Sequence, residues 1–171
     1  MGSYHPSVMT DWKDLAAEAP RIAAVFERRH RAAGNLCLLA TLRADGSPRI
    51  SPMEPRIFDG RLVLVGMPNT RKFADLVRDR RFSLHTATVD PHVGDGDAKV
   101  WGVVRDEQDL DLHRRFAEDL FAETGMDLRG SRFAPYWVAD LAGASSVEFV
   151  DGQLTIRIWK PGQGERAQPL G

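Results

Sequence analysis

At three places along the chain, an Asp-Gly pair joins two runs that are rich in apolar residues: Asp45–Gly46, Asp59–Gly60 and Asp151–Gly152. Glycine adopts a positive φ without steric penalty, so this pattern predicts tight β-hairpin turns. A tight hairpin joins antiparallel strands, because parallel strands need a longer crossover. The three pairs therefore predict an antiparallel sheet. They argue against a βαβ dinucleotide-binding fold, whose G-x-G-x-x-G motif the sequence also lacks.

Helical patterns precede and interrupt these runs. Thr10 or Asp11 can cap a first helix, and a second begins at Pro20, because proline fits the first helical turn. Two further amphipathic helices are predicted at residues 71–79 and 109–123. The predicted strands are residues 36–43, 48–58, 61–67, 82–89, 98–105, 136–141, 145–150 and 153–159. A small antiparallel barrel with flanking helices fits this order of elements best.

Two prolines lie in the second predicted strand, at Pro52 and Pro55. Proline has no amide donor for a neighbouring strand. We therefore expect residues 48–58 to form an edge strand, a bulged strand or one that lines a ligand site.

The composition supports one folded unit in the cytoplasm. The chain has 171 residues, of which 43% are hydrophobic, and a formal net charge of −1. That balance gives no general attraction to nucleic acid or to an anionic membrane. The polar N-terminus does not resemble an export signal, and no apolar run reaches the roughly 18 residues of a membrane span. We expect an N-terminal helical segment at residues 1–34, a barrel domain at 35–161 and a flexible tail at 162–171.

The segment after the third predicted strand has the chemistry of an anion site. Thr70 stands at the expected start of a helix, and Arg71 and Lys72 occupy its first turn. Cations are unfavourable there against the helix dipole unless an anion neutralises them. A helix start with free amides, a hydroxyl and two cations suits a phosphate group. The alternative is a basic helix start that is simply solvated.

Taken together, these segments resemble the pyridoxamine 5'-phosphate oxidase-like, FMN-binding split-barrel superfamily. The resemblance extends from about Leu36 to Trp159 and depends on the order and spacing of several short motifs. These motifs are Leu39–Leu42, Asp45–Ser51, Asp59–Leu62, Thr70–Lys72, Leu76, Asp79–Arg81, Val100–Val103 and Leu154–Gly162.

The resemblance implies a mainly β, α+β fold, namely a six-stranded antiparallel split β-barrel of Greek-key type with flanking helices. It also implies a homodimer with two cofactors at the subunit interface. Thr70, Arg71 and Lys72 would bind the FMN phosphate. The ribityl chain and ring would meet Arg49, Ile50 and Ser51, while Val65 and Gly66 would contact the flavin through their backbone. Lys99 matches a position that reaches the cofactor from the other subunit.

The sequence departs from the family pattern at two places. Pyridoxamine phosphate oxidases hold their substrate with a C-terminal Arg-x-His motif, whereas this chain has Arg157 followed two positions later by Trp159, so vitamin B6 oxidation is not expected. A position often filled by lysine, three residues beyond Ser51, holds Glu54, whose carboxylate would repel a phosphate, so we expect that this position does not face the cofactor.

The remaining residues suggest no acid, base, nucleophile or metal site. The five histidines, His5, His30, His85, His92 and His113, show no metal-ligand spacing, and Cys37 is the only cysteine. No catalytic or metal-binding residues are therefore predicted. Trp101, Trp137 and Trp159 are expected in the core or at a dimer interface, although one of them could stack on a flavin.

The leading hypothesis is an FMN-dependent oxidoreductase that transfers hydride to or from a small molecule, since the cofactor itself supplies the chemistry. One alternative keeps the fold but uses the deazaflavin coenzyme F-420, whose longer anionic tail would need further basic residues near Arg71, such as Arg49 and Arg56. Another is a protein that binds flavin or haem without turnover, with His85 as the candidate axial ligand of haem. The last alternative is a split-barrel dimer that has lost its ligand.

Overall fold

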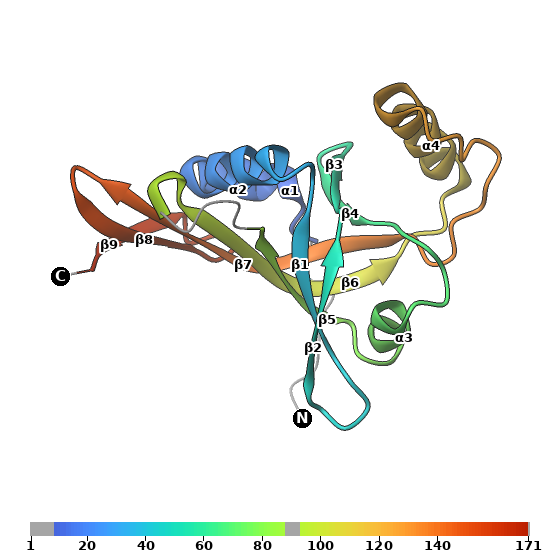
Figure 1. Cartoon of the computed structure of the whole chain (residues 1–171), viewed down its shortest axis with the longest axis horizontal. Coiled ribbons are helices and arrows are strands. Elements are labelled where there is room, and N and C mark those ends of the chain that lie inside the picture. The colour runs from blue at the N-terminus through green and yellow to red at the C-terminus, as the bar shows by residue number, and fades with distance from the viewer. Residues whose placement is uncertain (1–8, 88–92, 171) are drawn as a thin grey trace.

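The computed structural model describes residues 9–87 and 93–170 (Figure 1). Within these residues nine strands form one antiparallel sheet in the order β2-β1-β5-β6-β7-β4-β3, in which β8 also pairs with β7, and β9 pairs with β8. The strands are β1 (Cys37–Leu42), β2 (Pro48–Met53), β3 (Arg56–Phe58), β4 (Arg61–Leu64), β5 (Arg81–Thr86), β6 (Asp97–Asp106), β7 (Trp137–Val150), β8 (Gln153–Trp159) and β9 (Glu165–Pro169). The helices are α1 (Trp12–Glu18), α2 (Pro20–Ala32), α3 (Arg71–Arg78) and α4 (Leu110–Thr124), with a short 3₁₀ turn, η1 (Val93–Asp95). The predicted α+β split-barrel class is confirmed, with more strands than the six expected.

Two of the Asp-Gly pairs form two-residue hairpins in which both residues have a positive φ. These angles are 52° and 70° at Asp59 and Gly60, and 49° and 79° at Asp151 and Gly152. Such angles match the right-handed twist of the flanking strands, as in a type I′ turn. The third pair lies in the longer turn between β1 and β2, where only Gly46 has a positive φ.

The run predicted as one strand at residues 48–58 is divided into β2 and β3 by Glu54 and Pro55. These two strands lie at opposite ends of the sheet order, because β2 pairs only with β1 and β3 only with β4. The chain itself closes the barrel at this point. Pro55 donates no amide bond, and its carbonyl oxygen lies 2.8 Å from Nε2 of His30. The expectation of an edge strand is confirmed for β2.

The strands predicted at residues 136–141 and 145–150 are one continuous strand, β7. Its middle passes Gly143, where an added Cβ would lie 2.4 Å from the ring of Trp101. The absence of a side chain at Gly143 thus lets the indole lie against the backbone. The register of the pairing between β6 and β7 shifts at a bulge between Trp101 and Gly102, and the two strands are paired on both sides of this bulge.

The segment predicted as a flexible tail contains β9, which pairs with β8. The Glu165 carboxylate attaches β9 to the start of α2, where its Oε2 accepts hydrogen bonds from the backbone amides of Arg21 and Ile22, both at 3.2 Å. In Figure 1 the β8–β9 hairpin lies at one end of the molecule, and α3 and α4 lie towards the other. The division into segments 1–34, 35–161 and 162–171 remains a prediction.

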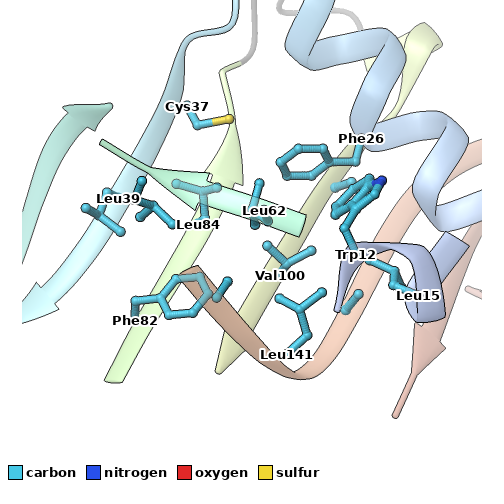
Figure 2. Close-up of a cluster of buried hydrophobic side chains, with 14 of the residues drawn as sticks. Trp12, Leu15, Phe26, Cys37, Leu39, Leu62, Phe82, Leu84, Val100 and Leu141 are labelled. Carbon is cyan, nitrogen blue, oxygen red and sulfur yellow. The ribbon is translucent and has the colours of Figure 1, made fainter. Parts of the chain in front are cut away.

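The main core fills the barrel. Leu39, Leu62, Leu84, Val100 and Leu141 come from five different strands and converge in its interior (Figure 2). The N-terminal helices cover this core with buried side chains that include Trp12, Leu15 and Phe26. A second, smaller core lies under α4. In the described part of the chain, no helix has the length and hydropathy needed to cross a bilayer.

Candidate functional site

Helix α3 begins at Arg71, with Thr70 in the N-cap position and an extended backbone. The Thr70 side chain makes no capping bond: its Oγ1 is buried and has no hydrogen-bond partner in the described structure. A buried hydroxyl without a partner costs about 1–3 kcal/mol. Thr70 therefore favours a hydrogen-bond partner from outside the chain, and a phosphate oxygen could provide one.

The two cations that follow Thr70 differ in their surroundings. Arg71 is exposed, and within the described residues its side chain makes no hydrogen bond or ion pair. Lys72 is half-buried, and its Nζ donates to the carbonyl oxygen of Pro52 at 2.7 Å. Burial lowers the pKa of Lys72, and the nearby Glu54 carboxylate partly offsets that effect. Arg71 is thus available to an anion, while Lys72 holds the end of β2 against α3.

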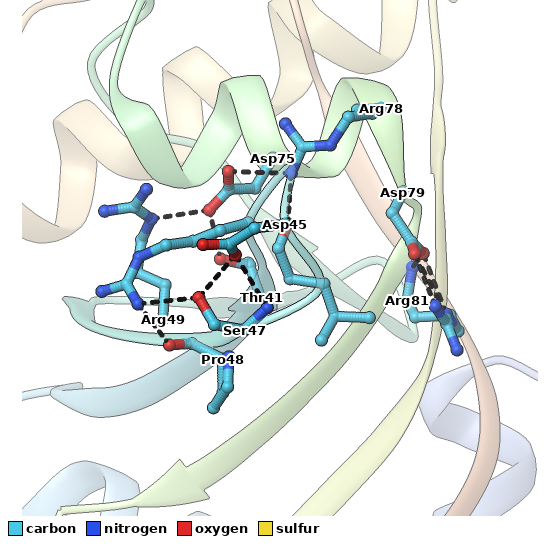
Figure 3. Close-up of polar contacts among 11 residues, drawn as sticks. Thr41, Asp45, Ser47, Pro48, Arg49, Asp75, Arg78, Asp79 and Arg81 are labelled. Carbon is cyan, nitrogen blue, oxygen red and sulfur yellow. Dashed lines mark hydrogen bonds and ion pairs between the residues drawn. The ribbon is translucent and has the colours of Figure 1, made fainter.

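Asp75 is the centre of a buried polar network that joins α3 to the barrel (Figure 3). Its Oδ2 accepts from Nε of Arg49 at 2.6 Å and from Oγ1 of Thr41 at 2.9 Å, and its Oδ1 accepts from Nη2 of Arg78 at 3.1 Å. Burial alone would raise the pKa of Asp75, but these hydrogen bonds from Arg49, Thr41 and Arg78 lower it below its ordinary value. Asp75 therefore stays ionised and orients two arginines.

A cavity of about 370 Å³ opens beside this network. Its ionisable lining consists of four arginines and two carboxylates: Arg43, Arg49, Arg71, Arg78, Asp45 and Asp75. Positive charge is therefore in excess. Since Arg49 contacts Asp75 through Nε, the two Nη nitrogens of its guanidinium remain for another acceptor. The cavity has the charge and the donors to bind an anion.

The predicted residues of β2 divide between the two faces of the sheet. Arg49 and Ser51 lie opposite the buried Thr41 and Leu39, on the side that faces the barrel interior and α3. Ile50 lies on the other face and is 72% exposed. The structure thus brings Arg49 together with Arg71 but does not bring Ile50 there.

Val65 and Gly66 lie just beyond β4, in the segment that leads to α3. A Cβ placed on Gly66 would be in ordinary contact with the ring of Phe73, at 3.5 Å. The backbone of this segment is therefore close to the first turn of α3.

Lys99 lies on β6, far from the other predicted residues. Its cross-strand neighbours are His85 on β5 and Ser145 on β7, on the outer face of the sheet. Three strand spacings separate β6 from β2, which is about 14 Å along the sheet. Lys99 therefore does not join the Arg71 cluster of its own protomer. Its contact with a cofactor held by another subunit remains a prediction.

A second, larger cavity of about 740 Å³ lies between α4, the loop that follows it and the segment after β4. Phe116, Leu120 and Phe133 contribute much of its apolar lining, and Val65 and Gly66 form part of its wall. The amphipathic pattern at residues 109–123 did not predict this cavity, because it places Phe116 and Leu120 on the buried face of a helix.

The other residues with reactive side chains are held in structural contacts. His85 Nδ1 lies 2.7 Å from the carbonyl oxygen of Thr86, and its Nε2 lies 3.6 Å from Asp97 Oδ1. Both ring nitrogens thus face protein oxygens, which disfavours His85 as a haem ligand. Burial raises the pKa of the Cys37 thiol to about 12, so this thiol is unreactive at neutral pH. Among the residues that the structure describes, no three His, Cys, Asp or Glu side chains gather as a metal site.

Two of the three tryptophans considered for stacking are buried. Trp137 is 2% exposed and Trp159 is fully buried, whereas Trp101 is half-buried on β6. His5 and His92 lie outside the described residues.

Sequence reasoning missed Arg43, Asp75 and Arg78. Asp75 precedes the buried Leu76 and lies at the edge of the apolar face of α3. A carboxylate that becomes buried beside an apolar helix face needs a cationic partner, and this requirement could have identified Asp75 from the sequence. The partner itself, Arg49, lies on a different element and could not be identified from spacing along the chain.

The sequence matches the profile of a known family over residues 25–140, and that family is described as Pyridoxamine 5'-phosphate oxidase. No curated protein matches the sequence.

Several solved structures share the fold. PhzG from Burkholderia lata, solved in complex with tetrahydrophenazine-1-carboxylic acid, has a TM-score of 0.60 and 14% identity, covering 96% of this chain and 98% of its own. A pyridoxamine 5'-phosphate oxidase-related, FMN binding protein from Nostoc punctiforme has a TM-score of 0.58 and 13% identity, covering 93% and 99%. A heme binding protein from Mycobacterium smegmatis has a TM-score of 0.54 and 20% identity, covering 85% and 57%. At these identities the likeness concerns the fold alone.

Proposed function

Because the chain belongs to the pyridoxamine 5'-phosphate oxidase family, we propose that it binds FMN and acts as an oxidoreductase that transfers hydride to or from a small molecule. FMN supplies the redox chemistry when bound, so the protein needs to contribute only binding, orientation and access. This division of roles agrees with the sequence, in which no acid, base or nucleophile was identified.

The observation that carries the proposal is the cationic cavity beside α3. Arg71, whose side chain has no partner among the described residues, lines this cavity, and the buried, unsatisfied hydroxyl of Thr70 lies one position before it in the chain. A phosphate at this point would accept hydrogen bonds from both groups and from the Nη nitrogens of Arg49. Lys72 would support the site by holding β2 in place through the Pro52 carbonyl oxygen.

Vitamin B6 phosphates are poor candidates for the substrate. The residues that stand where the family has Arg-x-His are engaged elsewhere: Arg157 donates to Glu148 Oε2 at 3.3 Å and to Glu165 Oε1 at 3.2 Å. Trp159 is fully buried, and its Nε1 donates to Glu18 Oε2 at 2.8 Å. Neither side chain is available to hold a substrate phosphate.

We propose further that the protein is a homodimer. Leu38 is 43% exposed and lies opposite Pro52, on the same outer face as the exposed Ile50 and as Lys99. An uncovered apolar sheet face of this kind often marks a protein interface. Lys99 is the residue for which the family resemblance implies contact with a cofactor held by the other subunit, and it lies on this face.

Titration of the cofactor-free protein with FMN tests the proposal. We expect the purified protein to show flavin absorbance, and Arg71→Ala to weaken FMN binding by about 10- to 100-fold, the loss of one charge-assisted contact. Arg80→Ala is the matched control, because Arg80 is also exposed but does not line the cavity. Equal affinities of the two variants would refute the placement of the phosphate.

A deazaflavin coenzyme is the second candidate, and the structure offers one observation in its favour. Arg43 and Arg78 add two cations to the cavity beyond those predicted, which suits a longer anionic tail. Arg56, by contrast, lies outside this cavity and forms an ion pair with Glu123. If deazaflavin is the ligand, Arg43→Ala should weaken its binding more than it weakens binding of FMN.

A further inference from the structure

The 740 Å³ cavity between α4 and the segment after β4 lies next to the proposed cofactor site and is not needed to hold a phosphate. Of the sixteen described residues that line it, ten have apolar side chains, and Gly66 is not counted among these ten. Two phenylalanine rings among them, Phe116 and Phe133, pack edge to face at 5.5 Å. A cavity of this size and lining can enclose most of a small organic molecule.

The rim of the cavity carries exposed and flexible side chains. Met67, in the segment after β4, is 78% exposed, and Met126, in the loop after α4, is 56% exposed. Thioether side chains adapt to irregular apolar shapes and make favourable contacts with aromatic rings. The rim thus suits a ring-containing ligand.

Of the residues that the structure describes, three ionisable ones line the cavity: Glu54, Arg56 and Arg132. Arg56 is paired with Glu123, and Arg132 Nη2 donates to Gln108 Oε1 at 3.3 Å. Glu54 lies on the side of Lys72 and of the proposed anion site. A phosphate ester would therefore meet a carboxylate and two arginines that already have partners, whereas four arginines line the cavity beside α3.

We propose that this cavity is the substrate site and that it takes a largely apolar, uncharged, ring-containing molecule rather than a phosphate ester. Its role as a substrate site depends on the proposed function, whereas its capacity to bind such a molecule does not. Val65 and Gly66 belong both to this cavity and to the predicted cofactor contacts, so a molecule here would lie beside the cofactor.

A fluorescent probe and a matched pair of competitors test the chemistry of the cavity. The probe is N-phenyl-1-naphthylamine, which is uncharged at neutral pH and fluoresces more strongly in apolar surroundings. The competitors are 1-naphthol and 1-naphthyl phosphate, which differ in the phosphate group. We expect 1-naphthol to displace the probe at a concentration at least about tenfold lower than 1-naphthyl phosphate does. Equal potency, or stronger displacement by the phosphate, would overturn the proposal.

Substitutions at the rim test the location. Ser131→Trp and Thr124→Trp each place a bulky ring at an exposed position that lines the cavity, and both should reduce probe affinity at least about tenfold. Leu110→Trp is the control, because Leu110 is 62% exposed on the same helix as Thr124 but outside the cavity. Thermal unfolding of each variant is the control that distinguishes a loss of probe affinity from a loss of folding. Unchanged probe binding in both rim variants would place the probe elsewhere and refute the proposal.

Two further measurements separate this inference from the proposed function. Arg71→Ala should abolish or weaken FMN binding and leave probe binding unchanged. If FMN binds but the probe does not, the substrate inference fails while the cofactor assignment stands. If the probe binds but FMN does not, the cofactor assignment fails, and only the capacity of the cavity to bind such a molecule stands. A change of oligomeric state in Ser131→Trp but not in Leu110→Trp would identify the cavity as a contact between subunits and overturn the inference.

Discussion

Arg49 Nε donates a 2.6 Å hydrogen bond to Asp75 Oδ2, although the two residues are 26 positions apart in the sequence. The bond joins the edge strand β2 to helix α3 and leaves the other end of the guanidinium for an anion. The same carboxylate accepts from Thr41 and Arg78, so one buried acid controls the geometry of the cationic cavity.

Replacing Asp75 should therefore affect both stability and binding. We expect Asp75→Asn to lower the free energy of unfolding by about 1.5–3 kcal/mol, because hydrogen bonds to a charged acceptor are weakened. FMN affinity should also fall, since Arg49 is no longer held in position. Denaturant unfolding and FMN titration measure the two effects. An unchanged stability would show that the network contributes little.

The pH dependence of stability gives an independent prediction for the same residue. The pKa of Asp75 is lower in the folded protein than its ordinary value of 3.8. The group therefore stabilises the fold above about pH 4, and its contribution is lost as the pH falls through the lower folded pKa. Between about pH 4 and pH 2, the free energy of unfolding should decrease more steeply in the unmodified protein than in Asp75→Asn. Equal slopes would contradict this assignment.

Thr70 should show opposite effects on stability and on cofactor binding. Thr70→Val replaces the unpaired buried hydroxyl by a methyl group of similar size, so the cofactor-free protein should become more stable by about 1 kcal/mol. FMN should bind about tenfold more weakly, because one phosphate contact is lost. Thr70→Ser keeps the hydroxyl and serves as the control for binding. Tighter FMN binding by Thr70→Val would exclude the proposed contact.

The proposed dimer depends on the outer face of β1 and β2. Ile50→Glu places a charge at the most exposed apolar position of that face and should raise the dimer dissociation constant by about 100-fold or more. Leu110→Glu introduces the same charge at a similarly exposed leucine on α4 and should leave association unchanged. Sedimentation velocity over a range of concentrations distinguishes the two. Identical behaviour of both variants would move the interface to another surface.

The segment after β8 forms the paired strand β9 in the structure, whereas the sequence predicted a flexible tail there, and a substitution at Glu165 distinguishes the two. Glu165 accepts from two amides at the start of α2 and from Arg157, so Glu165→Ala should cost about 1–2 kcal/mol of stability. Glu165→Gln keeps an acceptor for the amides and should retain part of that stability. A mobile tail would make both substitutions neutral in thermal or denaturant unfolding.

Features that depend on neighbouring residues were accessible from the sequence. The Asp59–Gly60 and Asp151–Gly152 turns require left-handed backbone, which the dipeptides themselves favour, and the hairpins form there. Pro20 begins α2, and the amphipathic pattern at residues 109–123 forms α4. The start of α3 at Arg71 was predicted for the same reason, which placed Thr70, Arg71 and Lys72 together at a helix start. Their binding of a phosphate remains a prediction.

The sequence by itself determined the antiparallel class, the bounds of α3 and α4 to within one residue and the position of Thr70, Arg71 and Lys72 at a helix start, because turn, capping and periodicity signals act over a few residues. Only the tertiary structure decided that Asp75 meets Arg49, that Lys99 lies on the outer face and that α4 and the segment after β4 enclose an apolar cavity. Each of these depends on which distant elements pack together. That packing is selected by the summed burial and hydrogen bonding of the whole chain, and no local pattern records it.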